Sequence, residues 1–147
     1  MKPIPSPFTA VDVDDIRQAI MLAELDTSAE IHVHLEEKCS GNCQSRAAEL
    51  FKKLGMDQTV EHNGILIYLS VRNKRFCICT DTGISKNVPE DTWLVIKQDF
   101  LNHLRNNNYT DGLIEVINRT GMHLKKFFPR RPGDPNQIPD EVTFGDI

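Results

Sequence analysis

Six side chains with carboxylate or amide oxygens stand near the ends of strands that the sequence predicts. They are Asp26, Glu30, Asp57, Glu61, Asn63 and Asp81. Ca²⁺ takes about six to eight oxygen ligands and Mg²⁺ about six, and acidic or amide side chains on loops supply them. The residue types therefore predict a divalent-cation site, provided that the fold brings them together. No EF-hand pattern is present, so separately solvated acids or helix caps are the alternative interpretation.

One of these acids lies in Thr80-Asp81-Thr82-Gly83, which is similar to the active-site triplet of aspartic proteases. Those enzymes combine two such loops so that two carboxylates share a proton. This chain has one copy, and the helices predicted below are incompatible with an all-β protease frame. We therefore interpret the segment as a turn at a strand end, in which Asp81 accepts hydrogen bonds from backbone amides.

Nitrogen and sulfur ligands are also present, but in incomplete sets. His32 and His34 lie two residues apart on one predicted strand face, whereas a zinc site needs about four donors. We interpret that face as exposed to solvent. Cys77 and Cys79 alternate with apolar residues and are predicted to be small, buried hydrophobic side chains.

The other two cysteines, Cys39 and Cys43, lie in a predicted turn and are more reactive candidates. They lack C-x-x-C spacing and have no histidine placed to activate them. Because no secretion signal precedes them, we expect all four cysteines to be reduced thiols.

Composition and charge exclude several classes of protein. The 147 residues are 39% apolar and 26% charged, which is typical of a globular chain that can form a hydrophobic core. The net charge of −4 and the scattered basic residues argue against nucleic-acid binding. No segment approaches about 18 consecutive apolar residues, so we expect a cytoplasmic monomer without membrane insertion. No phosphate loop, G-x-S-x-G or H-E-x-x-H motif is present.

Hydrophobic periodicity predicts about four helices and three strands in a single domain spanning residues 1–147. The predicted helices are residues 12–25 with Asp12 as N-cap, a helix that ends at Gly55, one from Pro89 to about residue 106, and one from Thr110 or Asp111 to Phe128. The predicted strands are residues 30–36, 65–69 and 76–79. Residues 1–10 and 129–147 are rich in proline and are predicted to be extended.

The order of these elements predicts a small mixed sheet. A right-handed crossover makes strands 30–36 and 65–69 parallel, and a hairpin makes strand 76–79 antiparallel to its neighbour. Strand 30–36 alternates apolar and polar residues, so we expect it at an edge with one face in solvent. The starts of the first two strands and the end of the third then lie along one edge of the sheet. This arrangement gathers the oxygen-bearing residues in one region.

Several short motifs between Glu30 and Phe128 resemble, in order and spacing, the TPM domain, a family named for a plant thylakoid lumen protein, a photosystem II repair protein and a nematode receptor modulator. The motifs are Glu30-Ile31-His32-Val33, Lys53-Leu54-Gly55-Met56, Thr59, Asn63-Gly64-Ile65-Leu66-Ile67-Tyr68, Asp81-Thr82-Gly83-Ile84, Trp93, Gly112-Leu113 and Phe128-Pro129. The resemblance implies a three-layer α/β/α sandwich with loops at one sheet edge that bind Ca²⁺ or Mg²⁺. By analogy with the family, Asp81, Glu30, Asn63 and Glu61 match its acidic positions. The resemblance also implies phosphatase activity, which is attributed to plant members.

Three functions are consistent with these observations. The first is a divalent-cation-binding protein with Asp81, Glu30, Asn63, Glu61 and Asp57 as metal ligands. The second is a metal-assisted phosphatase for phosphomonoesters, with Glu61 as base. A phosphatase also needs a cationic side chain to hold the phosphate, and we expect none closer to the cluster than Lys86. The third is a metal-ordered module that binds an unidentified protein partner.

Overall fold

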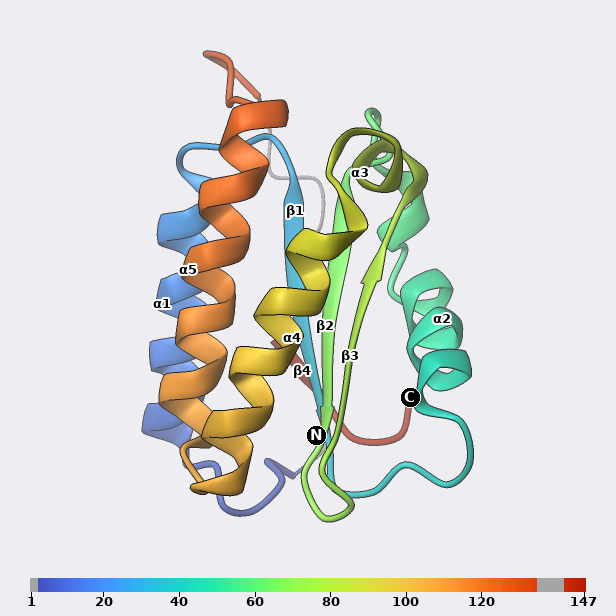
Figure 1. Cartoon of the computed structure of the whole chain (residues 1–147), viewed down its shortest axis with the longest axis vertical. Helices are drawn as coiled ribbons and strands as arrows, with labels where there is room; N and C mark the ends of the chain where they lie inside the picture. The colour runs from blue at the N-terminus through green and yellow to red at the C-terminus, as the bar shows by residue number, and fades with distance from the viewer. Residues whose placement is uncertain (1–2, 135–141) are drawn as a thin grey trace.

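A four-stranded sheet forms the centre of the protein, with helices on both of its faces (Figure 1). The computed structural model describes residues 3–134 and 142–147. In chain order the elements are α1 (Ala10–Glu24), β1 (Glu30–Glu36), α2 (Cys43–Lys53), η1 (Met56–Gln58), β2 (Gly64–Ser70), β3 (Arg75–Thr80), α3 (Thr82–Asn87), α4 (Glu90–Arg105), α5 (Tyr109–Phe127) and β4 (Val142–Phe144). The strand order is β3-β2-β1-β4, with β1 parallel to β2 and β4 and with β3 antiparallel to β2. The predicted α/β/α class, the parallel pair and the hairpin are confirmed.

Two apolar cores lie on opposite faces of the sheet. The larger core packs α1, α4 and α5 against one face, which includes Ile31 and Val33 of β1. The smaller core lies under α2, where Leu50 packs with Leu66 and Tyr68 of β2. Successive side chains of a strand point to opposite faces, so the continuous apolar run of β2 contributes to both cores. Figure 1 shows the resulting three layers, with α1, α4 and α5 on one side of the sheet and α2 on the other.

The first helix begins two residues before its predicted start. Thr9 is the N-cap, and its hydroxyl accepts a hydrogen bond from the Asp12 N–H (3.2 Å) while the Asp12 carboxylate accepts one from the Thr9 N–H (2.8 Å). Asp12 is therefore the third helical residue of a capping box rather than the predicted N-cap. α1 packs along α5, where a Cβ at Gly121 would lie only 2.9 Å from the Cβ of Ala23.

The prediction that strand 30–36 is a half-exposed edge strand is wrong. β4 pairs with β1 on the side away from β2, and every residue of β1 is buried. His32 and His34, expected in solvent, are 1% and 0% exposed. The covering strand comes from the other end of the chain, so the local alternation of β1 contains no sign of it.

Three elements were not predicted. The 3₁₀ helix η1 follows Gly55, the short helix α3 follows Asp81, and β4 forms within the proline-rich segment 129–147, which was expected to lie extended over the surface. All three are short, and β4 depends on pairing with β1. Residues 1–2 and 135–141, which belong to the predicted extended termini, lie outside the described residues.

Candidate functional site

Backbone pairing brings three of the predicted ligand residues together at one end of the sheet. Glu30 is the partner of Gly64 in the β1–β2 ladder, and the Asp81 N–H donates to the Gly64 carbonyl from the other side (3.0 Å). The Glu30 N–H donates to the Asn63 carbonyl (3.3 Å). Glu30 is the first residue of β1, Asn63 directly precedes β2 and Asp81 directly follows β3, so the three residues stand at neighbouring strand ends, as the topology predicted.

Asn63 is fully buried, and its side chain forms a hydrogen bond through its donor nitrogen alone among the described residues. The backbone N–H donates to Thr59 Oγ1 (3.0 Å), and the side-chain Nδ2 donates to Ser28 Oγ (3.2 Å). Ser28 Oγ in turn donates to Glu61 Oε2 (2.7 Å). Asn63 Oδ1 remains buried without a hydrogen-bond partner in the part of the chain that the structure describes. A buried acceptor left in this state costs about 1–3 kcal/mol, so a ligand that bound the oxygen would remove a penalty.

Asp81 has one satisfied and one unsatisfied carboxylate oxygen. Oδ1 accepts a hydrogen bond from the Thr82 N–H (2.7 Å) at the start of α3, as the strand-end turn predicted. Oδ2 is buried and accepts no hydrogen bond from residues 3–134 or 142–147. His62 Nδ1 lies 3.5 Å from Oδ2, which is too long for a hydrogen bond and is an ion pair only when the imidazole is protonated.

Close backbone contact holds the loop at residues 61–62 against the start of α3. The Gly83 N–H donates to the His62 carbonyl (2.8 Å), and a Cβ on Gly83 would lie 2.5 Å from that oxygen. Only glycine allows this approach. Thr82-Gly83 therefore brings the loop with Glu61 and His62 close to Asp81, which is a packing role and not a protease signature.

The remaining predicted ligand residues differ in burial and in whether they are linked to Asn63 and Asp81. Glu30 is buried, whereas the Glu61 side chain is 37% exposed. Asp57 is half-buried on η1, and among the described residues no hydrogen bond or ion pair joins its carboxylate to the rest of the group. Asp26 is exposed, and its backbone carbonyl accepts a hydrogen bond from the Arg130 N–H (3.2 Å).

Sequence reasoning missed Ser28, His62 and Arg131. Arg131 Nη2 lies 3.9 Å from Glu61 Oε2, so the expectation that Lys86 is the nearest cation to the cluster is wrong. The end of α5 reaches the start of β1 because the Ser28 N–H donates to the Phe128 carbonyl (2.9 Å). No local pattern reveals this approach, which depends on how α5 packs across the sheet.

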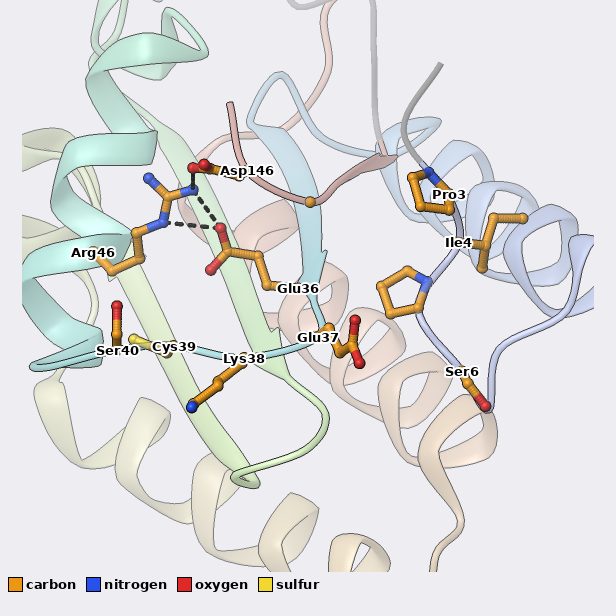
Figure 2. Close-up of a pocket in the computed structure, with 12 residues that line it drawn as sticks. Pro3, Ile4, Ser6, Glu36, Glu37, Lys38, Cys39, Ser40, Arg46 and Asp146 are labelled. Carbon is orange, nitrogen blue, oxygen red and sulfur yellow. Dashed lines mark hydrogen bonds and ion pairs between the residues drawn. The ribbon is translucent and has the colours of Figure 1, made fainter.

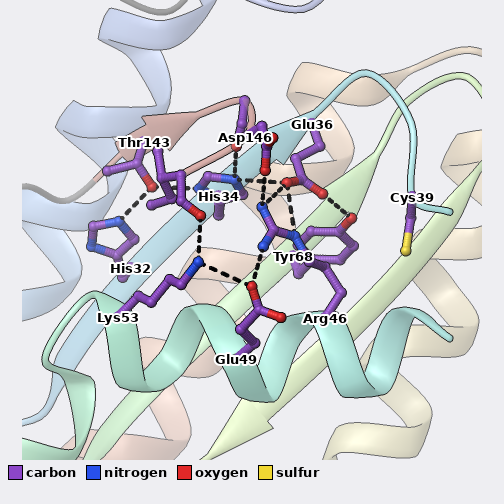
Figure 3. Close-up of polar contacts among 12 residues, drawn as sticks. His32, His34, Glu36, Cys39, Arg46, Glu49, Lys53, Tyr68, Thr143 and Asp146 are labelled. Atoms are coloured by element: carbon purple, nitrogen blue, oxygen red, sulfur yellow. Dashed lines mark hydrogen bonds and ion pairs between the residues drawn. The ribbon is translucent and has the colours of Figure 1, made fainter. Parts of the chain in front are cut away.

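A second polar group is buried on the face of β1 that looks toward α2 (Figure 3). Thr143 Oγ1 of β4 lies 3.0 Å from His32 Nε2 and 2.6 Å from His34 Nδ1, and His34 Nε2 lies 2.8 Å from the Gly145 carbonyl. Burial, with a smaller contribution from His34, lowers the pKa of His32 to about 3. Burial also lowers the pKa of His34. Both imidazoles are therefore neutral near pH 7.

The same group continues into a buried ion pair at the end of β1. Glu36 accepts hydrogen bonds from Arg46 of α2 and from the Tyr68 hydroxyl of β2. Burial alone would raise the pKa of Glu36, but the bonds from Arg46 and Tyr68 outweigh burial and hold that pKa below its usual range. Arg46 also pairs with Glu49 (2.8 Å) and with Asp146 (3.5 Å).

A cavity of about 600 Å³ lies beside this ion pair, between the end of β1 and the N-terminal segment at Pro3 and Ile4 (Figure 2). Arg46 and Glu36 form part of its wall, but they are hydrogen-bonded to each other. Of the unpartnered buried side-chain atoms in the described chain, none belongs to Glu36, Arg46 or Tyr68. The oxygen-rich sheet edge is therefore the stronger candidate for a ligand site.

Two further absences concern residues 3–134 and 142–147. No three His, Cys, Asp or Glu side chains are grouped there as a metal site, so any ion at the sheet edge depends also on amide or hydroxyl oxygens. No helix in these residues combines the length and the apolar composition that a membrane crossing requires.

The three layers and the strand order define a small α/β/α sandwich domain. At one end of its sheet, the loop at residues 61–62 packs closely on Gly83 beside β1, β2 and β3. Residues 7–123 match the TPM domain, and the chain belongs to this family. The family resemblance expected from the sequence is confirmed. A search of curated proteins gives no significant match.

Solved structures show the same fold. The chain is similar to the NMR structure of the BA42 protein from the psychrophilic bacterium Bizionia argentinensis, with 36% identity and a TM-score of 0.89 over 99% of this chain and 100% of that one. The N-terminal domain of cg2496 from Corynebacterium glutamicum has 12% identity and a TM-score of 0.64, over 80% of this chain and 74% of that one. The N-terminal domain of a P. gingivalis protein has 17% identity and a TM-score of 0.63, over 83% and 76%. The last two likenesses concern the fold alone.

Proposed function

We propose that this TPM-domain protein binds a divalent cation, Ca²⁺ or Mg²⁺, at the sheet edge formed by Glu30, Glu61, Asn63 and Asp81. The observation that carries the proposal is a pair of buried oxygens, Asn63 Oδ1 and Asp81 Oδ2, that have no hydrogen-bond partner in the described residues. Both residues adjoin Gly64: Asn63 precedes it in the chain, and the Asp81 N–H donates to its carbonyl.

The chemistry of the group fits a hard cation. Carboxylate, amide and hydroxyl oxygens are the donors that Ca²⁺ and Mg²⁺ prefer, and sulfur and imidazole ligands are not needed. Glu30 at the start of β1 and Asp81 directly after β3 would each contribute a carboxylate, the ligand type that supplies negative charge to a hard cation. Asp57 is not included in this set, because no hydrogen bond or ion pair within residues 3–134 and 142–147 joins its carboxylate to the other four residues.

Thermal melts with and without metal test the proposal. At about a hundred times Kd, a ligand that binds only the folded state stabilises it by about 2.7 kcal/mol, which raises Tm by about 5–10 °C in a chain of this size. We expect CaCl₂ or MgCl₂ to produce this rise and EDTA to reverse it. Asp81→Asn keeps an acceptor for the Thr82 N–H but removes the charge, so it should lose the metal-dependent rise.

Asp14→Asn is the matched control, because Asp14 is an exposed acid on α1 with a side chain 77% exposed. This variant should respond to metal as the wild-type protein does. An unchanged wild-type Tm at millimolar Ca²⁺ and Mg²⁺, or an equal response of Asp81→Asn, would contradict the proposal. Backbone NMR titration should place the shifts at Asn63 and Asp81.

The position of Arg131 favours one alternative, hydrolysis of phosphomonoesters at the same edge. A guanidinium beside Glu61 can hold a phosphoryl group in the bidentate manner that arginine provides, while Glu61 takes a proton from water. A bound cation would supply polarisation of a phosphoryl oxygen. Hydrolysis of p-nitrophenyl phosphate should then fall at least tenfold in Arg131→Gln and in Glu61→Gln. Turnover that both substitutions and EDTA leave unchanged would exclude this alternative.

A further inference from the structure

Two cysteines from different elements meet beneath α2. Cys43 is the first residue of α2, and Cys77 lies in β3 opposite Tyr68. Their sulfur atoms are 2.7 Å apart, and all four cysteines are free thiols. The two residues are 34 positions apart in the chain, and the packing of α2 on β3 brings them together.

The two thiols differ in their access to solvent. Cys77 is 2% exposed in the smaller core, whereas Cys43 is half-buried at the border of that core. Burial, followed by the hydrogen bond with Cys43, raises the pKa of Cys77 to about 12. Cys77 therefore stays protonated at neutral pH, and a dissolved reagent reaches Cys43 first.

The other two cysteines are less well placed. Cys39 is buried in the same core, with its sulfur 4.0 Å from the Gly41 carbonyl, and Cys79 lies two residues beyond Cys77 in β3. Among the described residues, Cys43 and Cys77 are the one pair of sulfur atoms in contact. Cys39 and Cys79 are therefore natural controls.

We propose that Cys43 and Cys77 form a redox modification site, at which a hydroperoxide converts the two thiols into an intramolecular disulfide between α2 and β3. In the first step the Cys43 sulfur attacks the peroxide, the O–O bond breaks, one oxygen leaves as water or alcohol, and Cys43 becomes a sulfenic acid. In the second step the Cys77 sulfur attacks the Cys43 sulfur, and the sulfenic oxygen leaves as water with the Cys77 proton. Two electrons pass from the thiol pair to the peroxide.

The disulfide has a measurable consequence for stability. It closes a loop that contains η1 and β2, and a cross-link across such a length restricts the unfolded chain. For this chain length we expect a rise in Tm on the order of 10 °C, reversed by dithiothreitol.

The test uses the full chain treated with hydrogen peroxide. Thiol titration should fall from four free thiols to two, and the intact mass should fall by the two hydrogens lost. Trypsin releases Cys39 together with Cys43 in the peptide 39–46, and Cys77 together with Cys79 in the peptide 76–86. The partners must therefore be assigned with variants.

The double variant Cys39→Ser/Cys79→Ser should keep the cross-link and the rise in Tm. Cys43→Ser should lose both, and Cys77→Ala provides a second test that leaves the half-buried position unchanged. Circular dichroism of each reduced variant checks that it folds. A cross-link that persists in Cys43→Ser, one that is lost in the Cys39→Ser/Cys79→Ser variant, or oxidation that gives only added oxygen or disulfide-linked dimers would overturn the proposal.

Discussion

We expect His32→Gln to remove much of the stability loss that the protein undergoes between pH 7.0 and pH 4.5. In the folded protein, burial lowers the pKa of His32 to about 3, whereas the unfolded chain has the ordinary pKa of 6.5. Between these two values the unfolded chain binds a proton that the folded chain does not bind. The contribution of His32 to stability is therefore fully present above pH 6.5 and is lost as the pH falls toward 3.

The magnitude follows from the two pKa values. One pKa unit corresponds to about 1.36 kcal/mol, so the interval from pH 6.5 to pH 4.5 costs about 2.7 kcal/mol of unfolding free energy. With a urea m-value of about 2 kcal/mol/M, the midpoint should fall by about 1.4 M more in the wild-type protein than in His32→Gln. Burial also lowers the pKa of His34, which adds a pH-dependent loss to both proteins. The difference between the two proteins therefore reports His32 together with its smaller interaction with His34.

Urea unfolding at the two pH values measures this difference, and Thr143→Val is the matched control. This variant removes the hydroxyl that both histidines share but keeps both imidazoles. It should be less stable by about 1–2 kcal/mol at both pH values and should retain the wild-type pH dependence. Equal midpoint shifts in wild-type protein and His32→Gln would refute the reasoning.

Three other substitutions test the packing and pairing described above. Arg46→Met leaves the Glu36 carboxylate buried without its cation and should lower the unfolding free energy by about 3–5 kcal/mol. The double variant Arg46→Met/Glu36→Gln should recover part of this loss. Urea unfolding measures it, and a loss below about 1 kcal/mol would contradict the prediction. Gly83→Ala places a Cβ 2.5 Å from the His62 carbonyl oxygen and should cost about 1–3 kcal/mol, measured as a lower Tm. Thr120→Val replaces a buried hydroxyl that has no partner in the described residues, so its Tm should equal or exceed that of the wild type.

Hydrophobic periodicity located the long helices and strands. The apolar residues that recur at regular spacing in the sequence form the face of each element that packs in the core. The predicted helix at 12–25 corresponds to Ala10–Glu24, and the predicted strand at 65–69 to Gly64–Ser70. The missed elements, η1, α3 and β4, have three, six and three residues, which are too few for a repeated pattern. β4 in particular exists as a strand through its pairing with β1.

The candidate site was predictable to the extent that chain topology places it. A right-handed crossover and a hairpin leave one arrangement of β1, β2 and β3, and this arrangement puts Glu30, Asn63 and Asp81 at one edge. Ser28 and Arg131 reach the same edge through the contact between the end of α5 and the start of β1. That contact joins segments about 100 residues apart, as the bond from the Thr27 hydroxyl to the Phe128 carbonyl shows.

The sequence by itself determined the family, the layers and the direction of three strands, because these depend on local spacing and on the order of elements. Only the tertiary structure decided which polar side chains are buried and which residues each of them contacts. His32 and His34 lie on a polar strand face, yet β4 covers them and Thr143 meets both. Cys43 and Cys77 have no local relation, yet their sulfur atoms touch. The burial of a side chain and its hydrogen-bond partners depend on segments that are distant in the chain. Both are therefore fixed only when those segments pack together.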